Sequence, residues 1–234
     1  MKQSIFLSLF VLMVISVTGQ NIQLHYDLGK DRKYPTSTVE FFKPDKCGST
    51  FMFVDMDYNI GEIKGVSSAY WEIARSVSWW KGPLAAHVEY NGGFLQWEAD
   101  SLRGVAQIDD AWLAGVDYIY NNESFTKGYT LQLLYKYIRD KHNASFQVTG
   151  VWYLYFLKNK MTFAGFADFW KEDNLFMENS LTSETHYVFM TEPQLWYNFT
   201  PHLAAGTEWE LSNNFAGVKG FQFNPTIGIK WTIE

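Results

Sequence analysis

The amino-acid sequence predicts an all-β protein that closes as an antiparallel barrel in a membrane, and three observations support this prediction. Strand-like segments with one apolar face follow one another along the chain, as expected where alternate side chains point to opposite faces. The 234 residues include 10 Trp, 14 Tyr and 19 Phe, while only 19% are charged, against roughly 25% in typical soluble chains. The N-terminal residues, finally, have the pattern of an export signal.

The N-terminal segment 1–19 reads as a cleaved signal peptide. A basic residue precedes an apolar run at Ile5–Val17, and small residues follow before the first polar position. The run is too short for a spanning helix. We therefore expect cleavage after Gly19 and one barrel domain over residues 20–234. No later segment has 18 consecutive apolar residues, which excludes spanning helices and leaves a closed barrel as the way to cross a membrane.

Twelve strands are expected, separated by turn signals. They are Asn21–Leu28, Thr38–Lys43, Phe51–Tyr58, Ser68–Trp80, Leu84–Tyr90, Asp109–Tyr120, Tyr129–Ile138, Ala144–Phe156, Met161–Trp170, Thr185–Tyr197, Leu203–Leu211 and Phe221–Glu234. The first strand alternates apolar residues with Gln23, His25 and Asp27, which must face the lumen because charges facing lipid are costly. The middle and last strands carry apolar stripes that we expect to face lipid, namely Val116, Tyr118, Leu131, Leu133, Ile229 and Trp231.

The gaps between these strands alternate in length. KPDKCGS, WKGP, YNNES, KNK and NFTPH are short and even-numbered, whereas the two longest gaps, NGGFLQWEADSLRG and KEDNLFMENSLTS, are odd-numbered. Bacterial barrels have an even number of strands, short periplasmic turns and longer outer loops. Twelve strands with this alternation therefore fit the pattern of a bacterial barrel.

A soluble β-sandwich is the alternative fold, because its half-buried strands alternate in the same way. It would hydrate the face opposite the apolar stripes. That face includes Phe51, Phe53, Leu113, Leu134 and Phe166. These side chains are too apolar for a hydrated exterior but suit a narrow, partly filled lumen, so the membrane barrel is favoured.

Three segments carry a family resemblance. FMFVDMDY at Phe51–Tyr58, AYWEIARSVS at Ala69–Ser78 and NPTIGIKW at Asn224–Trp231 resemble strands of the Tsx-like nucleoside-specific channel-forming outer-membrane proteins. The resemblance follows the order and spacing over most of the chain, although each motif is short. It implies a monomeric twelve-stranded barrel with a narrow pore that binds nucleosides. The chain departs from the family in its short loops and in ending with Glu234 rather than an aromatic residue.

Nucleoside binding needs aromatic side chains for the base and carboxylates or amides for the sugar hydroxyls. Phe51 and Phe53 share a strand face with Asp55 and Asp57, so these four are candidate substrate-binding residues. The alternative is that the two Phe side chains only plug the lumen.

Glu72, Arg75, His87 and Glu89 complete the candidate substrate-binding set. Glu72 and Arg75 have opposite parity, so both can face inward only across a bulge; otherwise one of them lies at a rim. A Glu–Arg pair that fixes the barrel wall is the alternative to a ligand contact. His87 and Glu89 share parity and either line the pore or form a structural hydrogen-bonded pair.

The leading hypothesis is an outer-membrane channel that passes small polar solutes, above all nucleosides, by facilitated diffusion. A plugged structural barrel is the first alternative, and a barrel enzyme acting on lipid or peptide is the second. No His lies in a nucleophile motif and no Cys/His pattern suits a metal, so we expect no catalytic residues, metal or cofactor. The expected partners are outer-membrane lipid, small polar solutes and the barrel assembly machinery, and the net charge of −6 argues against nucleic acid.

Overall fold

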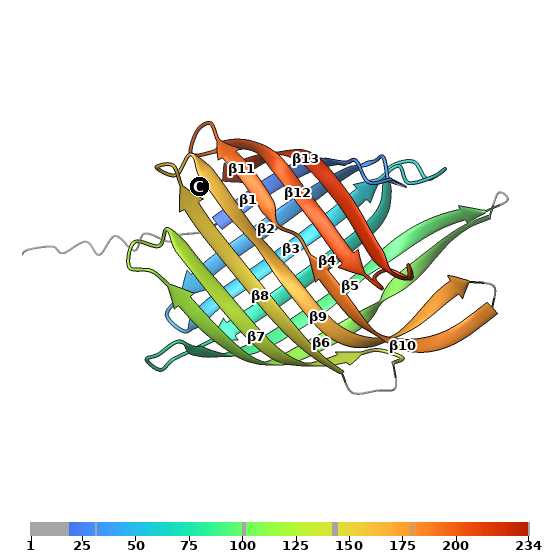
Figure 1. Ribbon diagram of the computed structural model, residues 1–234, viewed down its shortest axis with the longest axis horizontal. Coiled ribbons are helices and arrows are strands. Elements are labelled where there is room, and N and C mark those ends of the chain that lie inside the picture. The colour runs from blue at the N-terminus through green and yellow to red at the C-terminus, as the bar shows by residue number, and fades with distance from the viewer. Residues whose placement is uncertain (1–18, 31, 100–101, 142–144, 179, 234) are drawn as a thin grey trace, which may run out of the picture.

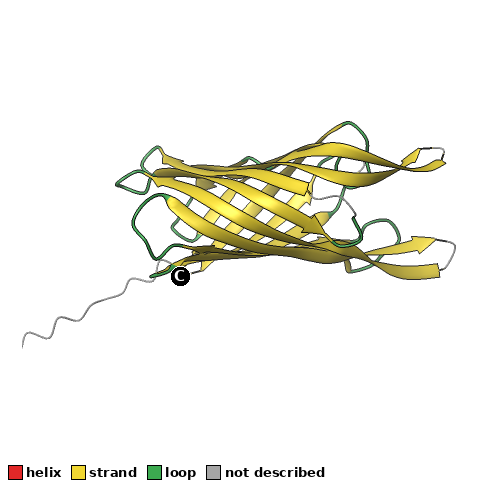
Figure 2. Ribbon diagram, turned by 90° about the horizontal axis from the view of Figure 1, so that it is seen from below, coloured by secondary structure: helices red, strands yellow, loops and turns green. Residues whose placement is uncertain are grey.

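The computed structural model describes residues 19–233, with gaps at 31, 100–101, 142–144 and 179, and gives only the backbone of residues 99, 174–178 and 180–185. In this part of the chain every element is a strand, and the strands are tilted around one long axis (Figures 1 and 2). No helix among the described residues is long and apolar enough to cross a membrane. The expected signal peptide, apart from Gly19, lies outside the described residues and stays a prediction.

The strands form one closed antiparallel sheet. They are β1 (Gly19–Asp27), β2 (Pro35–Asp45), β3 (Gly48–Tyr58), β4 (Val66–Val77), β5 (Leu84–Ala99), β6 (Leu102–Asn121), β7 (Lys127–Ile138), β8 (Ser145–Phe156), β9 (Met161–Glu178), β10 (Ser180–Thr191), β11 (Gln194–Asn198), β12 (Leu203–Asn213) and β13 (Phe221–Ile233). The first and last strands pair, with Gln20 opposite Ile233, so the sheet closes on itself. The predicted all-β closed barrel is confirmed.

The wall has twelve staves, meaning strand positions around the barrel, because β10 and β11 are two parts of one stave. Both pair with β9 on one side and with β12 on the other. The break falls at Glu192 and Pro193, since proline has no N–H for the ladder. Opposite the break, a Cβ on Gly165 would lie 2.5 Å from the carbonyl oxygen of Glu192, so the close approach requires glycine. The predicted count of twelve strands is confirmed, with one stave interrupted.

Both ends of the described chain lie at the same end of the barrel as the five short turns. These turns are 46–47, 78–83, 122–126, 157–160 and 199–202. Bacterial barrels place such turns in the periplasm, so this is the periplasmic end. The opposite, extracellular end carries the remaining loops and two hairpins, β5–β6 and β9–β10, that extend past the other strands (Figure 1).

Two segments expected to be long outer loops are paired strands, so that part of the prediction was wrong. β5 continues to Ala99 and β6 begins at Leu102, and β9 and β10 pair up to Glu178 and Ser180. In the first hairpin the regular pairing is interrupted only by a register shift between Asn91 and Gly93. The strand alternation then resumes, which the glycines and charged residues of this segment obscured in the sequence.

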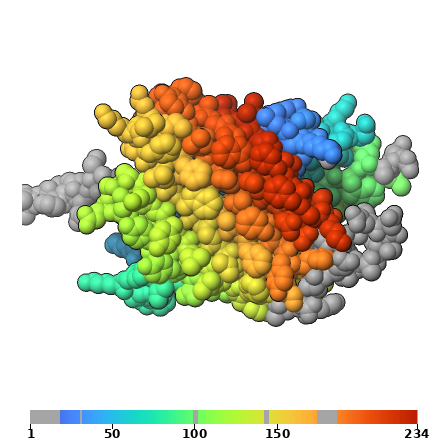
Figure 3. All heavy atoms as spheres, viewed as in Figure 1, coloured from blue at the N-terminus to red at the C-terminus, as the bar shows by residue number. Residues whose placement is uncertain are grey.

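The outer surface of the barrel is apolar, as predicted. The six side chains expected to face lipid are 41–54% exposed, namely Val116, Tyr118, Leu131, Leu133, Ile229 and Trp231. Aromatic rings stack near each end, Tyr118 on Tyr129 at the periplasmic end and Phe169 on Tyr187 at the extracellular end, as in the girdles of membrane barrels. Figure 3 shows one side of this outer surface, over β7 to β13.

Candidate functional site

The inner face of the barrel has two kinds of wall. On β5 to β8 the inward side chains are buried against one another, and we call this the packed wall: His87, Glu89, Asn91, Leu113, Asp117, Leu134, Lys136, Gln147 and Thr149. On β2 to β4 and β9 to β12 many inward side chains are only half-buried, and we call this the accessible wall: Thr38, Glu40, Phe51, Phe53, Asp55, Asp57, Tyr70, Glu72, Phe166, Asp168, Glu192 and Glu208. A solute in the lumen would contact the accessible wall.

The four candidate residues on β3 all lie on the accessible wall. The rings of Phe51 and Phe53 are 5.9 Å apart, and Tyr70 of β4 lies 6.0 Å from Phe53. Toward the extracellular end the same face carries Asp55 and Asp57. The structure therefore brings an aromatic row and two carboxylates together along one line of the lumen.

Hydrogen bonds hold the two Asp carboxylates differently. The Thr38 hydroxyl donates to Oδ1 of Asp55 at 2.5 Å, and among the described residues no donor reaches its Oδ2. Asp57 is engaged at both oxygens, by Thr36 at 2.6 Å and Ser68 at 2.7 Å. Asp55 is therefore the carboxylate with a free acceptor oxygen.

Glu72 and Arg75 point to opposite sides of the barrel wall. Glu72 faces the lumen and accepts a 2.7 Å hydrogen bond from the Tyr70 hydroxyl. Arg75 lies on the outer side near the periplasmic end, where its guanidinium donates to Asp45 at 2.6 and 2.9 Å. No bulge separates the two, because the β3–β4 register is regular from Gly48 to Asp57. The assignment of Arg75 to substrate binding was wrong, and no Glu72–Arg75 pair forms.

His87 and Glu89 lie in the packed wall. The two ring nitrogens of His87 contact two carboxylates, Nδ1 that of Asp117 at 3.0 Å and Nε2 that of Glu89 at 3.1 Å. Ser76 also donates to Asp117. The three side chains of the His87 pairings are 1%, 0% and 7% exposed, so this group ties neighbouring strands together and is covered from the lumen.

Carboxylates from both sides of the accessible wall meet across the middle of the lumen. We call the set the carboxylate belt: Asp55 of β3, Glu72 of β4, Asp168 of β9, Glu192 at the β10–β11 break and Glu208 of β12. Glu192 interacts electrostatically with Glu208, Asp55 and Glu72, and Glu72 with Asp168. Three members were missed in the sequence, although strand parity puts Asp168 on the face of Phe166, which the sequence had assigned to the lumen.

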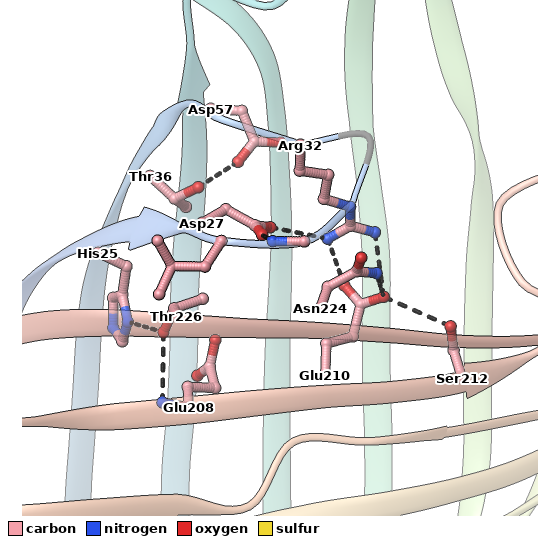
Figure 4. Close-up of polar contacts among 12 residues, drawn as sticks. His25, Asp27, Arg32, Thr36, Asp57, Glu208, Glu210, Ser212, Asn224 and Thr226 are labelled. Atoms are coloured by element: carbon pink, nitrogen blue, oxygen red, sulfur yellow. Dashed lines mark hydrogen bonds and ion pairs between the residues drawn. The ribbon is translucent and has the colours of Figure 1, made fainter.

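The extracellular mouth holds a second cluster. Arg32 reaches from the loop between β1 and β2 to Glu210 on β12, with contacts of 2.7 and 3.0 Å, and to Asp27 at 3.3 Å (Figure 4). Asn224 also donates to Glu210, at 3.0 Å. We call these contacts the mouth latch. The latch connects the loop between β1 and β2 to β12, across the β1–β13 seam.

Two further features bear on catalysis and metal binding. His25 contacts the hydroxyl of Thr226 at 2.9 Å, but its other nitrogen meets the Gln23 amide oxygen at 3.0 Å. A hydrolytic triad would need a carboxylate or an equivalent orienting acid there. Among the described residues no group of three His, Cys, Asp or Glu side chains is arranged to hold a metal ion.

Comparisons with known proteins support the fold. A family model described as a domain of unknown function (DUF5020) matches residues 19–233. Comparison with curated protein sequences gave no match. Among solved structures, the NanC porin is similar with a TM-score of 0.57 and 10% identity, over 92% of this chain and 100% of that one.

Two other solved barrels show weaker similarity. Omp33 of Acinetobacter baumannii has a TM-score of 0.44 and 14% identity over 93% of this chain and 98% of its own. OmpT of Vibrio cholerae has a TM-score of 0.41 and 10% identity over 92% and 96%. With its apolar exterior and closed sheet, the chain is a bacterial outer-membrane β-barrel, whereas membership of the Tsx-like nucleoside channels stays a prediction.

Proposed function

Because the chain belongs to the DUF5020 family, a domain of unknown function, and folds as an outer-membrane barrel, we propose that it is a channel through which small polar solutes diffuse. The main support is the accessible wall, where inward charged side chains keep partial exposure to solvent. In a plugged barrel, carboxylates such as Asp55 and Glu208 would be covered by other side chains, as those of the packed wall are. The similar fold of a protein named as a porin agrees with this proposal.

Nucleosides are the solutes that we propose first. A base can stack on the half-buried Phe53 within the aromatic row, whose ring centroids lie 5.9 and 6.0 Å apart. The free Oδ2 of Asp55 then lies farther along the same strand face and can accept a hydrogen bond from a sugar hydroxyl. Asp57 is the poorer partner because both of its oxygens are already engaged.

We also propose that the barrel has no catalytic activity. His87 is enclosed between two carboxylates, and His25 is paired with a Thr hydroxyl and an amide. Neither histidine can therefore serve as a base that is oriented by an acid and free to receive a proton from a nucleophile.

Planar bilayer recordings of the purified protein test the proposal. We expect an open channel whose current is partly blocked by millimolar adenosine or thymidine. Phe53→Ala should weaken the block about tenfold, since stacking a base on an aromatic ring contributes about 1–3 kcal/mol. Phe223→Ala, which removes a ring from the outer wall, is the matched control and should leave the block unchanged.

Failure of the channel proposal and failure of the nucleoside assignment would give different recordings. A protein that inserts but never conducts would identify a plugged structural barrel and refute the channel. A conducting protein whose current ignores nucleosides would leave the channel standing and refute the nucleoside assignment alone.

A further inference from the structure

The carboxylate belt brings five acidic side chains together where the lumen is accessible. Its five members come from opposite sides of the barrel, and Glu208 also interacts with Asp55 across it. Rings of Asp and Glu are how many pores select cations. A set of acids is not by itself a binding site, so the neighbouring cations and acceptors decide what the belt does.

The nearby cations are engaged by other groups. The Lys136 ammonium donates to Gln147 at 2.8 Å and lies 4.3 Å from the Trp170 ring. Lys230 lies 4.2 Å from the Trp196 ring, and Arg32 is held in the mouth latch. Lys136 offsets part of the charge of Glu72 and Asp168, and Lys230 part of that of Glu208. The belt therefore has five acidic side chains against two partly shared lysines.

A buried acceptor beside the belt gives an independent indication of a ligand. Asn91 is opposite Glu72 in the β4–β5 register, and its residue is 5% exposed. It belongs to the packed wall on the lumen side of β5, beside Glu72 of the accessible wall, and its Oδ1 is buried without a hydrogen-bond donor. Glu192 likewise accepts no hydrogen bond from the described residues. An unpaired buried acceptor is costly, and a ligand that carries N–H or O–H donors and a positive charge would satisfy both the Asn91 oxygen and the half-exposed Glu192 carboxylate.

The surroundings favour an organic cation over a metal ion. No described group of three acids or histidines is close enough together to hold a metal, so the belt surrounds the lumen rather than a single point. Phe53 and Tyr70 border it, and aromatic faces attract ammonium groups and stack on their hydrocarbon parts. We infer that the belt is a cation filter of the proposed channel, and that among charged solutes it favours small organic ammonium ions.

This inference rests on the proposed channel being open, and the test distinguishes failure of the inference from failure of the channel. Purified protein in a planar bilayer is placed in a tenfold KCl gradient, and the reversal potential gives the ratio of K⁺ to Cl⁻ permeability. Choline is then compared with its uncharged isostere 3,3-dimethylbutan-1-ol as a blocker of the K⁺ current. We expect cation selectivity, and block by choline at millimolar levels at least fivefold stronger than by the isostere.

Substitutions of single carboxylates show which of them cause the cation selectivity and the choline block. Glu192→Gln and Glu72→Gln should each lower the permeability ratio about two- to fivefold, as expected from removing one charge in a partly hydrated lumen, and should weaken the choline block similarly. Glu123→Gln, in an exposed periplasmic turn, removes the same charge outside the lumen and should change neither. Unaltered electrophoretic mobility of the folded barrel shows that a variant has assembled.

Three results would overturn the inference or the proposed channel. Conduction without cation preference, or with choline and its isostere equal, overturns the inference while the channel stands. Selectivity that Glu123→Gln reduces as much as Glu192→Gln does would assign the effect to overall charge and also overturn it. Absence of any current overturns the channel itself.

Discussion

The mouth latch gives a quantitative prediction for Arg32→Ala. The substitution removes a guanidinium that contacts Glu210 at 2.7 and 3.0 Å and Asp27 at 3.3 Å. It leaves two carboxylates of like charge close together at the mouth. Their side chains are only 10% and 6% exposed, whereas that of Arg32 is 25% exposed.

The expected loss lies between two known limits. Removing one partner of a buried ion pair costs roughly 3–5 kcal/mol, and exposed pairs contribute about 0–1 kcal/mol. Because the acids are buried and the Arg is partly solvated, we expect Arg32→Ala to lower the free energy of unfolding by about 2 kcal/mol. Glu210→Gln should lose less, since the amide still accepts one hydrogen bond.

The measurement is urea unfolding in phospholipid vesicles, followed by Trp fluorescence. Arg32→Ala, Glu210→Gln and the double variant form a cycle, and the coupling energy should be about 1–2 kcal/mol. Lys33→Ala is the matched control, because it removes the next cation of the same loop, an exposed one whose Nζ donates to a backbone carbonyl. If Arg32→Ala destabilises no more than Lys33→Ala, the latch contributes nothing and the reasoning is refuted.

Three further predictions use the same unfolding measurement. Leu133→Arg should cost roughly 2–4 kcal/mol because a charge then faces lipid at mid-depth; an unchanged midpoint would mean that this face is not in lipid. Gly165→Ala should cost about 1–3 kcal/mol since its Cβ would meet backbone at 2.5 Å, while Gly150→Ala, with open space, stays within about 0.5 kcal/mol; equal losses would contradict the close approach at the break. Asp117→Ala should lower the free energy of unfolding by roughly 3–5 kcal/mol because it leaves His87 with one carboxylate. An unchanged free energy of unfolding would show that the His87–Asp117 contact does not stabilise the packed wall.

The sequence was sufficient wherever the signal is local. Period-two alternation shows which side chains of a strand share a face, so the lipid-facing Leu133 and the inward Asp55 were assigned correctly. Pairing between strands is not local, and the arm beyond Asn91 looked like a loop because its glycines and charges hide an alternation that a neighbouring strand completes. Arg75 was misassigned because its family-like motif outweighed its parity.

The three carboxylates of the belt that were not predicted show a different limit of sequence-based reasoning. Asp168, Glu192 and Glu208 are spread over some forty positions of the chain, and parity alone can show that a residue on a regular strand points inward. Their depth along the barrel depends on strand stagger and on closure between β1 and β13, which are properties of the whole sheet. Glu192 lies inside the strand expected at Thr185–Tyr197, but the break between β10 and β11 at this point was not predicted.

The division between packed and accessible walls has a consequence for how this barrel tolerates change. Substitutions on the inner face of β5 to β8 would disturb side chains that hold one another, so they should reduce the yield of folded protein. Those on the inner face of β2 to β4 border solvent and can vary in size and charge with little effect on assembly. In a library of variants, selection for folding and selection for altered permeation through the proposed channel would therefore act on different strands. The accessible wall could then be redesigned without changing the packed wall.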